Sequence, residues 1–476
     1  MKKTVTICLS ALLLLLCACG KSEEAALAEP VRAVFAEEEN APVGNPAAFS
    51  GPAAVPCSSV EALCSAFADR EERSREAQFV SRGDSIGEVT ATVGDVAYIL
   101  RDYCVEIVRM NDRGAERLAT LETGYLWRET DGEDSWSGSE KQCAALLVSG
   151  QRLVVLSDLC AFSIAKESSD WISRDSSRCT VDIYDITEPA APRWMRGFSQ
   201  SGSESGCLVT DGRLFLMTDR EIYADDTLAD GTLPGWWQGE VWTALPASQI
   251  YLCRGGSASY LQLGVYALEN AAEPALRALV GCGEEGLLCE RGLYGLIPTA
   301  QGSEVYYLPV MDGTIGEPVA SLLTESYPSV SALTGAGDGL CLLQDGTVAL
   351  EGVDRQCRFG EGTLTLTHRE NSVELAVDGP DAASHILGHD FAVAIDADGA
   401  IYADAERGLI GLPSEDGYTL MALGKNGFSH LLDCYSSDCA GNRRAWVWRD
   451  TLFVSDRKRL FTIDLNSRKL ISTLTF

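Results

Sequence analysis

The feature that most constrains the fold is a short unit that recurs along the chain, a Gly or Asp turn followed by an apolar strand of about five residues. The clearest copy begins at Asp211-Gly212, and further copies lie at residues 94–100, 150–156, 291–296, 339–343 and 449–454. After several copies come a second strand, as at 180–186 and 459–465, and a third, as at 193–198 and 469–474. Short polar turns between apolar strands are typical of antiparallel meanders, so we expect an all-β protein.

These strands are apolar along most of their length, which indicates that each sheet buries both faces. Radial repetition of such sheets gives a β-propeller, which protects its edges by closing on itself. We therefore expect a single closed β-propeller, of about seven or eight blades at roughly 45–50 residues each. A chain of β-sandwich domains is the alternative. Residues 125–142, 165–178 and 224–243 are rich in Trp, Ser, Asp and Gly and are predicted to be insertions without a strand pattern.

The N-terminus carries a secretion signal. Lys2 and Lys3 precede a short apolar run, and the run ends in Leu16-Cys17-Ala18-Cys19. Such a run is too short to span a bilayer as a mature helix. Small residues before a cysteine resemble the bacterial lipobox, which implies cleavage after Ala18 and a lipid on Cys19. We therefore expect residues 1–18 to be a lipoprotein signal peptide and the mature chain to be anchored outside the cytoplasm by this lipid.

Two further segments are expected before the propeller. Residues 19–56 are rich in Ala, Glu and Pro and predict a disordered tether, because few large apolar side chains are available to bury. Residues 57–78 predict a short helical lead-in, with Ser58 and Glu61 at capping-box spacing. Four residues share its apolar face: Val60, Leu63, Cys64 and Phe67. The propeller domain is then expected over residues 79–476.

Charge and cysteine content limit the partners and the redox chemistry. A formal net charge of −31 argues against nucleic acid and against electrostatic adsorption to anionic lipid. The 17 cysteines show no CxxC pair and no regular framework, and export permits disulfides without proving them. Two pairs flank predicted turns: Cys434 with Cys439, and Cys282 with Cys289.

Three parts of the chain are similar to a known family. They are VDIYDITEPAAPR at residues 181–193 followed by DGRLFL at 211–216, ERGLIGLP at 406–413, and the C-terminal run from residue 443 onward. They resemble secreted bacterial lipoproteins with a C-terminal β-propeller domain distantly related to WD40 repeats. The resemblance spans roughly residues 57–476 and implies a propeller at the cell exterior without a known reaction. Residues 81–88 fit the family's acidic segment poorly.

Motifs that suggest chemistry are explained better by turns and strands. Residues 281–286 match GxGxxG, but the run that follows predicts a strand, whereas dinucleotide binding needs a helix. His385 and His389 lack the Glu that a zincin places after its first His. Asp396 and Asp398 begin like a calcium loop but lack its remaining ligands. We therefore expect no catalytic residue, no cofactor and no metal.

The sequence favours a binding protein or scaffold whose partner is a protein, a peptide or a glycan. A hydrolase or lyase that uses carboxylates in the propeller channel is one alternative, and an envelope assembly or maintenance factor is another. Trp236 and Trp237 lie beside Gly235 and Gly239 in one of the predicted insertions. In a Gly-flanked loop both indoles can be exposed, and exposed tryptophans dominate binding energy where they meet a partner. Both are therefore predicted to belong to the ligand face.

Overall fold

The computed structural model describes most of the predicted propeller region. The described residues are 54–74, 90–131, 135–165, 171–222, 232–254, 256–282, 286–289, 292–299, 302–323, 353–359, 362–369, 372–378, 382–388, 402–414, 417–435, 444–455 and 458–476. Within them the chain forms strands, one α-helix, α2 (Val60–Ser74), and one 3-10 turn, η2 (Ala247–Gln249). The protein is therefore all-β, as predicted.

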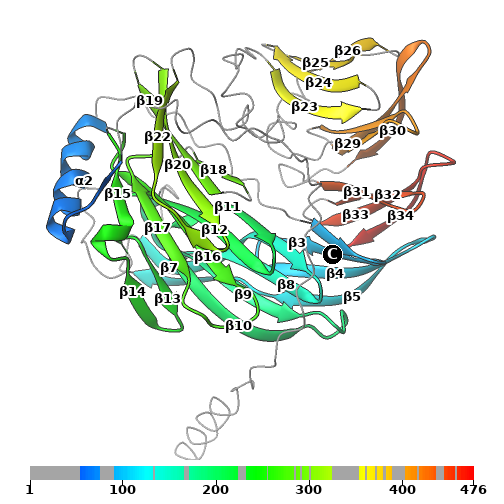
Figure 1. Ribbon diagram of the computed structural model, residues 1–476. Helices are drawn as coiled ribbons and strands as arrows, with labels where there is room; N and C mark the ends of the chain where they lie inside the picture. The colour runs from blue at the N-terminus through cyan, green and yellow to red at the C-terminus, as the bar shows by residue number, and fades with distance from the viewer. Residues whose placement is uncertain are drawn as a thin grey trace, which may run out of the picture.

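The strands form a propeller-like succession of antiparallel sheets (Figure 1). Four of the sheets are meanders of four strands that follow one another in the chain. The first is β2 (Thr90–Val93), β3 (Val96–Leu100), β4 (Cys104–Asn111) and β5 (Gly114–Glu122). Three follow late in the chain: β23 (Val353–Phe359), β24 (Gly362–Arg369), β25 (Ser372–Val377) and β26 (Ala383–Leu387); β27 (Tyr402–Asp404), β28 (Leu409–Ser414), β29 (Gly417–Gly424) and β30 (Gly427–Tyr435); and β31 (Arg444–Trp448), β32 (Thr451–Ser455), β33 (Arg459–Asp464) and β34 (Lys469–Thr475).

Three larger sheets lie between the first and the last three. The wide sheet has the order β14-β13-β10-β9-β8-β7-β6 and comprises β6 (Tyr125–Asp131), β7 (Ser135–Ser149), β8 (Arg152–Ala165), β9 (Trp171–Asp185), β10 (Arg193–Ser201), β13 (Gly235–Gln238) and β14 (Val241–Ala244). The next contains β1 (Val55–Pro56), β15 (Ile250–Leu252), β17 (Ala275–Val280), β16 (Ser259–Ala267), β12 (Arg213–Glu221) and β11 (Ser203–Thr210). The third contains β18 (Gly286–Cys289), β19 (Gly292–Thr299), β20 (Gly302–Met311), β21 (Thr314–Ile315) and β22 (Val319–Leu323).

The recurring turn-and-strand unit produces these meanders. The hairpin between β11 and β12 turns at Asp211 and Gly212, which have φ values of 48° and 68°. A left-handed pair of this kind matches the twist of antiparallel strands, and Asp-Gly is well suited to it. The copies predicted at 94–100, 150–156, 211–217, 291–296 and 449–454 each lead into a strand. The copy at 339–343 lies outside the described residues.

Neighbouring sheets pack face to face through shared apolar clusters. Val154 of the wide sheet shares one cluster with Leu214 of β12, and Leu261 of β16 shares another with Leu308 of β20. The β23–β26 sheet packs on the β27–β30 sheet, and the latter packs on the β31–β34 sheet. Edge strands also contact neighbouring sheets: β2 lies against β7, and β11 lies against β7 and β18. The apolar strands β8, β12 and β32 are thus covered on both faces, as their composition predicts.

The last sheet lies against the first. In Figure 1 the red strands β31–β34 lie beside the blue-to-cyan strands β3–β5, where the C-terminus is marked. Phe453 and Leu460 share a buried cluster with Ile99 and Met110. The Arg117 guanidinium donates a hydrogen bond to the Thr475 carbonyl oxygen at 2.9 Å. The two ends of the described propeller region are therefore in direct contact.

Helix α2 packs against the sheet that contains β16 through Leu63 and Phe67, two of the four residues of its predicted apolar face. Val60, also predicted on that face, is 49% exposed. The predicted cap at Ser58 is wrong. The Ser59 hydroxyl oxygen accepts a hydrogen bond from the Ala62 backbone N–H at 3.2 Å, so Ser59 is the N-cap. The carboxyl of Glu61 has a pKa below its usual value because backbone N–H and Ser59 hydrogen bonds favour its charged form. At the end of the predicted tether, Val55–Pro56 forms strand β1.

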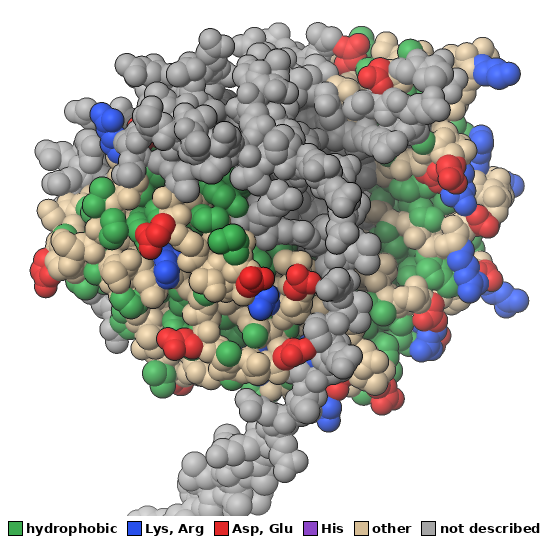
Figure 2. All heavy atoms as spheres, viewed as in Figure 1, with side chains coloured by type: hydrophobic (Ala, Val, Ile, Leu, Met, Phe, Trp, Pro, Cys, Tyr) green, Lys and Arg blue, Asp and Glu red, His purple; other side chains and the backbone are tan. Residues whose placement is uncertain are grey.

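The predicted insertions are also wrong in part. Residues 125–131 and 135–149 are strands β6 and β7, residues 171–185 are strand β9, and residues 235–244 contain β13 and β14. These segments widen one sheet instead of forming loops. On the face that Figure 2 shows, acidic and basic side chains of the described residues are interspersed, without a large area of one sign.

Candidate binding face

One face of the wide sheet brings aromatic and charged side chains together. Strand register places Tyr125 opposite Lys141, Lys141 opposite Leu159, and Leu159 opposite Arg178. It also places Asp182 opposite Gly197, and Trp237 opposite Ser199. Because alternate residues of a strand share a face, Tyr125, Trp127, Trp194 and Trp237 lie on the same side of the sheet. We call this the aromatic face and define it by Tyr125, Trp127, Lys141, Asp182, Arg178, Trp194 and Trp237.

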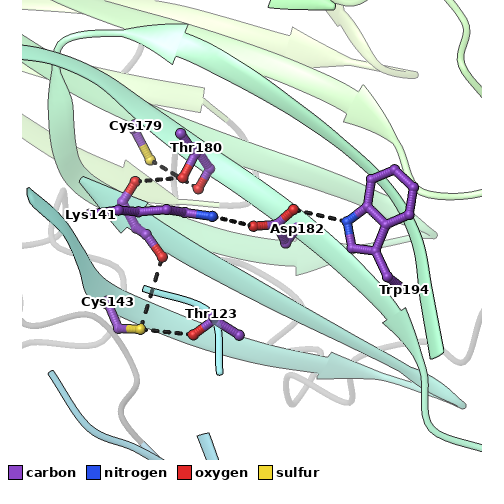
Figure 3. A network of polar contacts seen from close by, with 8 residues as sticks. Thr123, Lys141, Cys143, Cys179, Thr180, Asp182 and Trp194 are labelled. Atoms are coloured by element: carbon purple, nitrogen blue, oxygen red, sulfur yellow. Dashed lines mark hydrogen bonds and ion pairs between the residues drawn. The ribbon is translucent and has the colours of Figure 1, made fainter. Parts of the chain in front are cut away.

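Asp182 lies at the centre of this face (Figure 3). One carboxylate oxygen forms an ion pair with the Lys141 ammonium at 2.6 Å, and the other accepts a hydrogen bond from Trp194 Nε1 at 3.0 Å. The side chains of Lys141 and Asp182 are only 18% and 17% exposed. An ion pair shielded in this way is less screened than a surface pair, so it holds both partners in one geometry. The carboxylate thereby fixes the indole of Trp194.

A bulge and a glycine make room for this arrangement. The register of β10 with β9 shifts between Trp194 and Arg196, which turns Trp194 toward the face of Asp182. A Cβ at Gly197 would lie 2.9 Å from the nearer Asp182 carboxylate oxygen and 3.1 Å from the Val181 carbonyl oxygen. Any other residue at position 197 would therefore push against Asp182. Glycine is required here for close approach and not for its backbone angles.

Part of the aromatic face is covered and part is open to solvent. The part of this side of the sheet around Val155 and Tyr184 packs on the β2–β5 sheet. These two residues share a buried cluster with Tyr98 and Val105. Trp127 is 52% exposed, Tyr125 is 46% exposed and Trp194 is 45% exposed. Exposed aromatic rings fixed on a rigid sheet offer flat apolar surfaces for stacking on a ligand.

The predicted ligand residues Trp236 and Trp237 are placed differently from the expectation. They lie on strand β13, not in a loop, so their side chains point to opposite faces of the sheet. Trp236 packs against the buried cluster that contains Leu63 and Phe67 of α2, so the prediction that its indole is exposed is wrong. Trp237 is on the aromatic face but only 9% exposed, with the Arg178 guanidinium 5.1 Å from its ring centre. Neither indole is exposed as predicted, because β13 pairs with β10.

The exposed residues Tyr125 and Trp127 were not singled out by the sequence. Their strand carries no continuous apolar run, because Arg128 and Glu129 follow directly. A signal was present in residues 135–139, where serines alternate with Trp136 and Gly138. Alternation of this kind indicates a strand with one face on small residues. Register puts Trp136 opposite Thr130, on the other side of the sheet from Trp127.

Two thiols lie beside the Asp182 network in Figure 3. Cys143 Sγ is 3.0 Å from the Thr123 hydroxyl oxygen, and burial raises the pKa of its thiol. Burial also raises the pKa of the Cys179 thiol well above its usual value. A raised pKa keeps a thiol protonated, and the protonated form is a poor nucleophile. These cysteines therefore pack as small apolar groups and are unsuited to covalent catalysis.

The other residues considered from the sequence are not brought together. His385 lies on strand β26, whereas a zincin needs this histidine on a helix. Its ring centre is 6.2 Å from that of Phe428. Gly286–Cys289 is strand β18, which confirms that a strand follows the GxGxxG match. Cys19, His389, Asp396 and Asp398 lie outside the described residues. Among the side chains that the structure describes, no group of three or more His, Cys, Asp and Glu could hold a metal ion.

Fold and site together define an all-β, propeller-like protein with an aromatic face on one widened sheet. The chain matches no protein-family model and no curated protein sequence. Among solved structures it is similar to apo AztD from Citrobacter koseri, with 10% identity over 80% of this chain and 94% of that chain, at a TM-score of 0.28. It is also similar to a candidate 6-phosphogluconolactonase from Bacteroides fragilis, with 8% identity over 83% and 96% of the two chains, at a TM-score of 0.35. At these TM-scores, the similarity to these structures does not indicate the function of the protein. In the described part of the chain, no helix is long and apolar enough to cross a membrane.

Proposed function

We propose that the protein is a lipid-anchored, extracytoplasmic binding protein, built on a single closed β-propeller, that holds a protein, peptide or glycan partner on its aromatic face. The observation that carries this proposal is the exposure of Trp127, Tyr125 and Trp194 on one face of a rigid sheet. Large exposed aromatic side chains are unfavourable in water and are typical of sites where a partner covers them. The formal net charge of −31 disfavours nucleic acid as that partner.

Closure of the ring is supported by the packing of the β31–β34 sheet on the β2–β5 sheet. A closed ring has no open sheet face at its ends, and it holds each sheet in a fixed orientation. The resemblance to secreted lipoproteins and the sequence around Cys19 support the location. Lipid on Cys19 would keep the propeller at the membrane while the tether leaves its faces accessible.

The test is a co-sedimentation assay with purified cell-wall sacculi and, in parallel, with washed envelope membranes stripped of the protein. Trp127→Ala should lower the bound fraction at least tenfold, as loss of a central aromatic contact does at binding sites. Trp136→Ala is the matched control, because this indole is also exposed (41%) but lies on the other side of the same sheet. Equal binding by wild type and Trp127→Ala on both materials would contradict the proposal.

A further inference from the structure

We infer that Cys253 and Cys282 form a disulfide bond, so that the protein carries a covalent staple between parallel strand ends. The two Sγ atoms are 3.5 Å apart, and both side chains are buried. Cys253 follows β15 directly, and Cys282 lies just after β17. No motif in the sequence brings them together, because two strands, β16 and β17, lie between them in the chain.

The backbones of both cysteines are held close by hydrogen bonds. Strands β15 and β17 are parallel neighbours, with Leu252 opposite Val280. The Cys253 backbone N–H donates to the Val280 carbonyl oxygen at 3.0 Å, and the Gly281 N–H donates to the Ser259 carbonyl oxygen at 2.8 Å. The two sulfur atoms therefore meet because the main chain positions them. A thiol pair held in this way has little chain entropy left to lose when the bond forms.

Forming the bond needs only a small side-chain movement. A disulfide has an S–S length of about 2.0 Å, so the sulfur atoms must approach by roughly 1.5 Å from their contact distance. A Cβ at position 295 would lie 2.7 Å from Cys282 Sγ, and Gly295 leaves this space free. Rotation about the Cα–Cβ bonds can then bring the sulfurs together without displacing a strand. The bond would replace the Cys282–Cys289 pairing considered from the sequence, since one sulfur forms one disulfide.

The oxidant is a disulfide, either of a thiol–disulfide oxidase or of a small molecule such as oxidised glutathione. One cysteine thiolate attacks a sulfur of that disulfide, forms a mixed disulfide and releases a thiolate. The second cysteine thiolate then attacks the mixed disulfide at the first cysteine's sulfur, forms the Cys253–Cys282 bond and releases the second thiolate. Two electrons and two protons pass to the oxidant, which ends as two thiols. Because both side chains are buried in the folded chain, exchange takes place while the chain folds or opens locally.

The bond would secure the attachment of the N-terminal lead-in. Strand β1 pairs only with β15 in its sheet, and β15 joins the rest of that sheet through β17. A disulfide between the ends of β15 and β17 would therefore oppose the separation of β15, β1 and the following helix α2 from the sheet. This inference does not depend on which ligand the aromatic face binds.

Peptide mapping after thiol blocking tests the pairing. Protein exported to an oxidising compartment is denatured in N-ethylmaleimide, digested without reductant and analysed by mass spectrometry, before and after incubation of the native protein with oxidised glutathione. We expect one cross-linked peptide pair that contains Cys253 and Cys282 and is two hydrogen masses lighter than the two thiol peptides. Recovery of both cysteines as single N-ethylmaleimide adducts from both samples would overturn the inference.

Melting with and without reductant gives an independent readout. A phosphine reductant should lower the melting temperature of the wild type by several degrees and leave Cys253→Ala/Cys282→Ala unchanged. Cys434→Ala, which removes another buried thiol, is the matched control and should keep the response. A response that persists in the double variant would contradict this pairing. If the double variant fails to fold, the cross-linked peptide of the wild type still decides.

Discussion

Arg152 is a charged residue buried in an unusual environment. It is 1% exposed, and within the described residues its guanidinium nitrogens have no hydrogen-bond partner. Burial lowers the pKa of this guanidinium, while the charges of Glu269 and Asp185 act in the opposite direction. A buried cation balanced only through space is costly, because desolvation is not repaid by hydrogen bonds.

We therefore expect Arg152→Met to leave the free energy of unfolding unchanged or to raise it by about 1–4 kcal/mol, the range for buried ion pairs replaced by apolar residues of similar volume. Urea denaturation measures the change. Arg193→Met is the control: Arg193 is exposed and pairs with Asp185 at 2.9 Å, so its replacement should matter little. A loss of more than about 2 kcal/mol in Arg152→Met would mean that this charge is satisfied by a partner and contributes to stability.

Tyr103 gives the fold a dependence on alkaline pH. Burial and a 2.7 Å hydrogen bond to the Glu140 carboxylate raise the pKa of its hydroxyl to about 12. Because the folded pKa lies above the unfolded value, this stabilisation is complete below about pH 10 and is lost as the pH rises toward 12. Tyr103→Phe should therefore flatten the fall of unfolding free energy over that interval. Equal slopes in the wild type and in Tyr103→Phe would contradict the assignment.

Helix α2 has two serines, Ser58 and Ser59, at its N-terminus, and its cap can be tested by replacing each in turn. Ser59, not Ser58, accepts the hydrogen bond from the first turn. Ser59→Ala should lower the free energy of unfolding by about 0.5–2 kcal/mol, the usual effect of removing an N-cap hydroxyl. Ser58→Ala should change it by only a few tenths. Chemical denaturation followed at this helix compares the two, and an equal effect of both substitutions would argue against the assigned cap.

The strands that the sequence predicts correctly are those with continuous apolar runs. The strands β3, β12 and β32 bury nearly every side chain, and each contains a run of consecutive apolar residues next to a polar turn. Strands β6 and β13 and the first half of β7 were not predicted because Ser, Gly and charged residues interrupt their apolar residues, so no continuous apolar run or clear alternation marks them. The aromatic face depends on these strands. Its pairing of Asp182 with Lys141 and Trp194 depends on register and a bulge, which no local pattern encodes.

The whole molecule is held together by contacts between sheets, including sheets that are far apart in sequence. Each described sheet shares a cluster with a neighbour, and the C-terminal sheet shares one with the first. The Phe476 ring lies 5.5 Å from the Arg101 guanidinium and 5.9 Å from that of Arg117, both near the first sheet. If the ring is closed as we propose, the propeller should unfold as one unit, because loss of the last sheet would expose the apolar face of the first.

Deletion of residues 463–476 tests ring closure most directly, because it removes β34 and the end of β33 while leaving the first sheet intact in sequence. Size-exclusion chromatography and amide hydrogen exchange are measured on the truncated and full-length chains. The closed ring predicts an aggregating truncated chain in which β3 and β4 lose their exchange protection along with β31 and β32. A soluble, folded truncated chain in which β3 and β4 exchange as slowly as in the full-length protein would contradict a closed propeller.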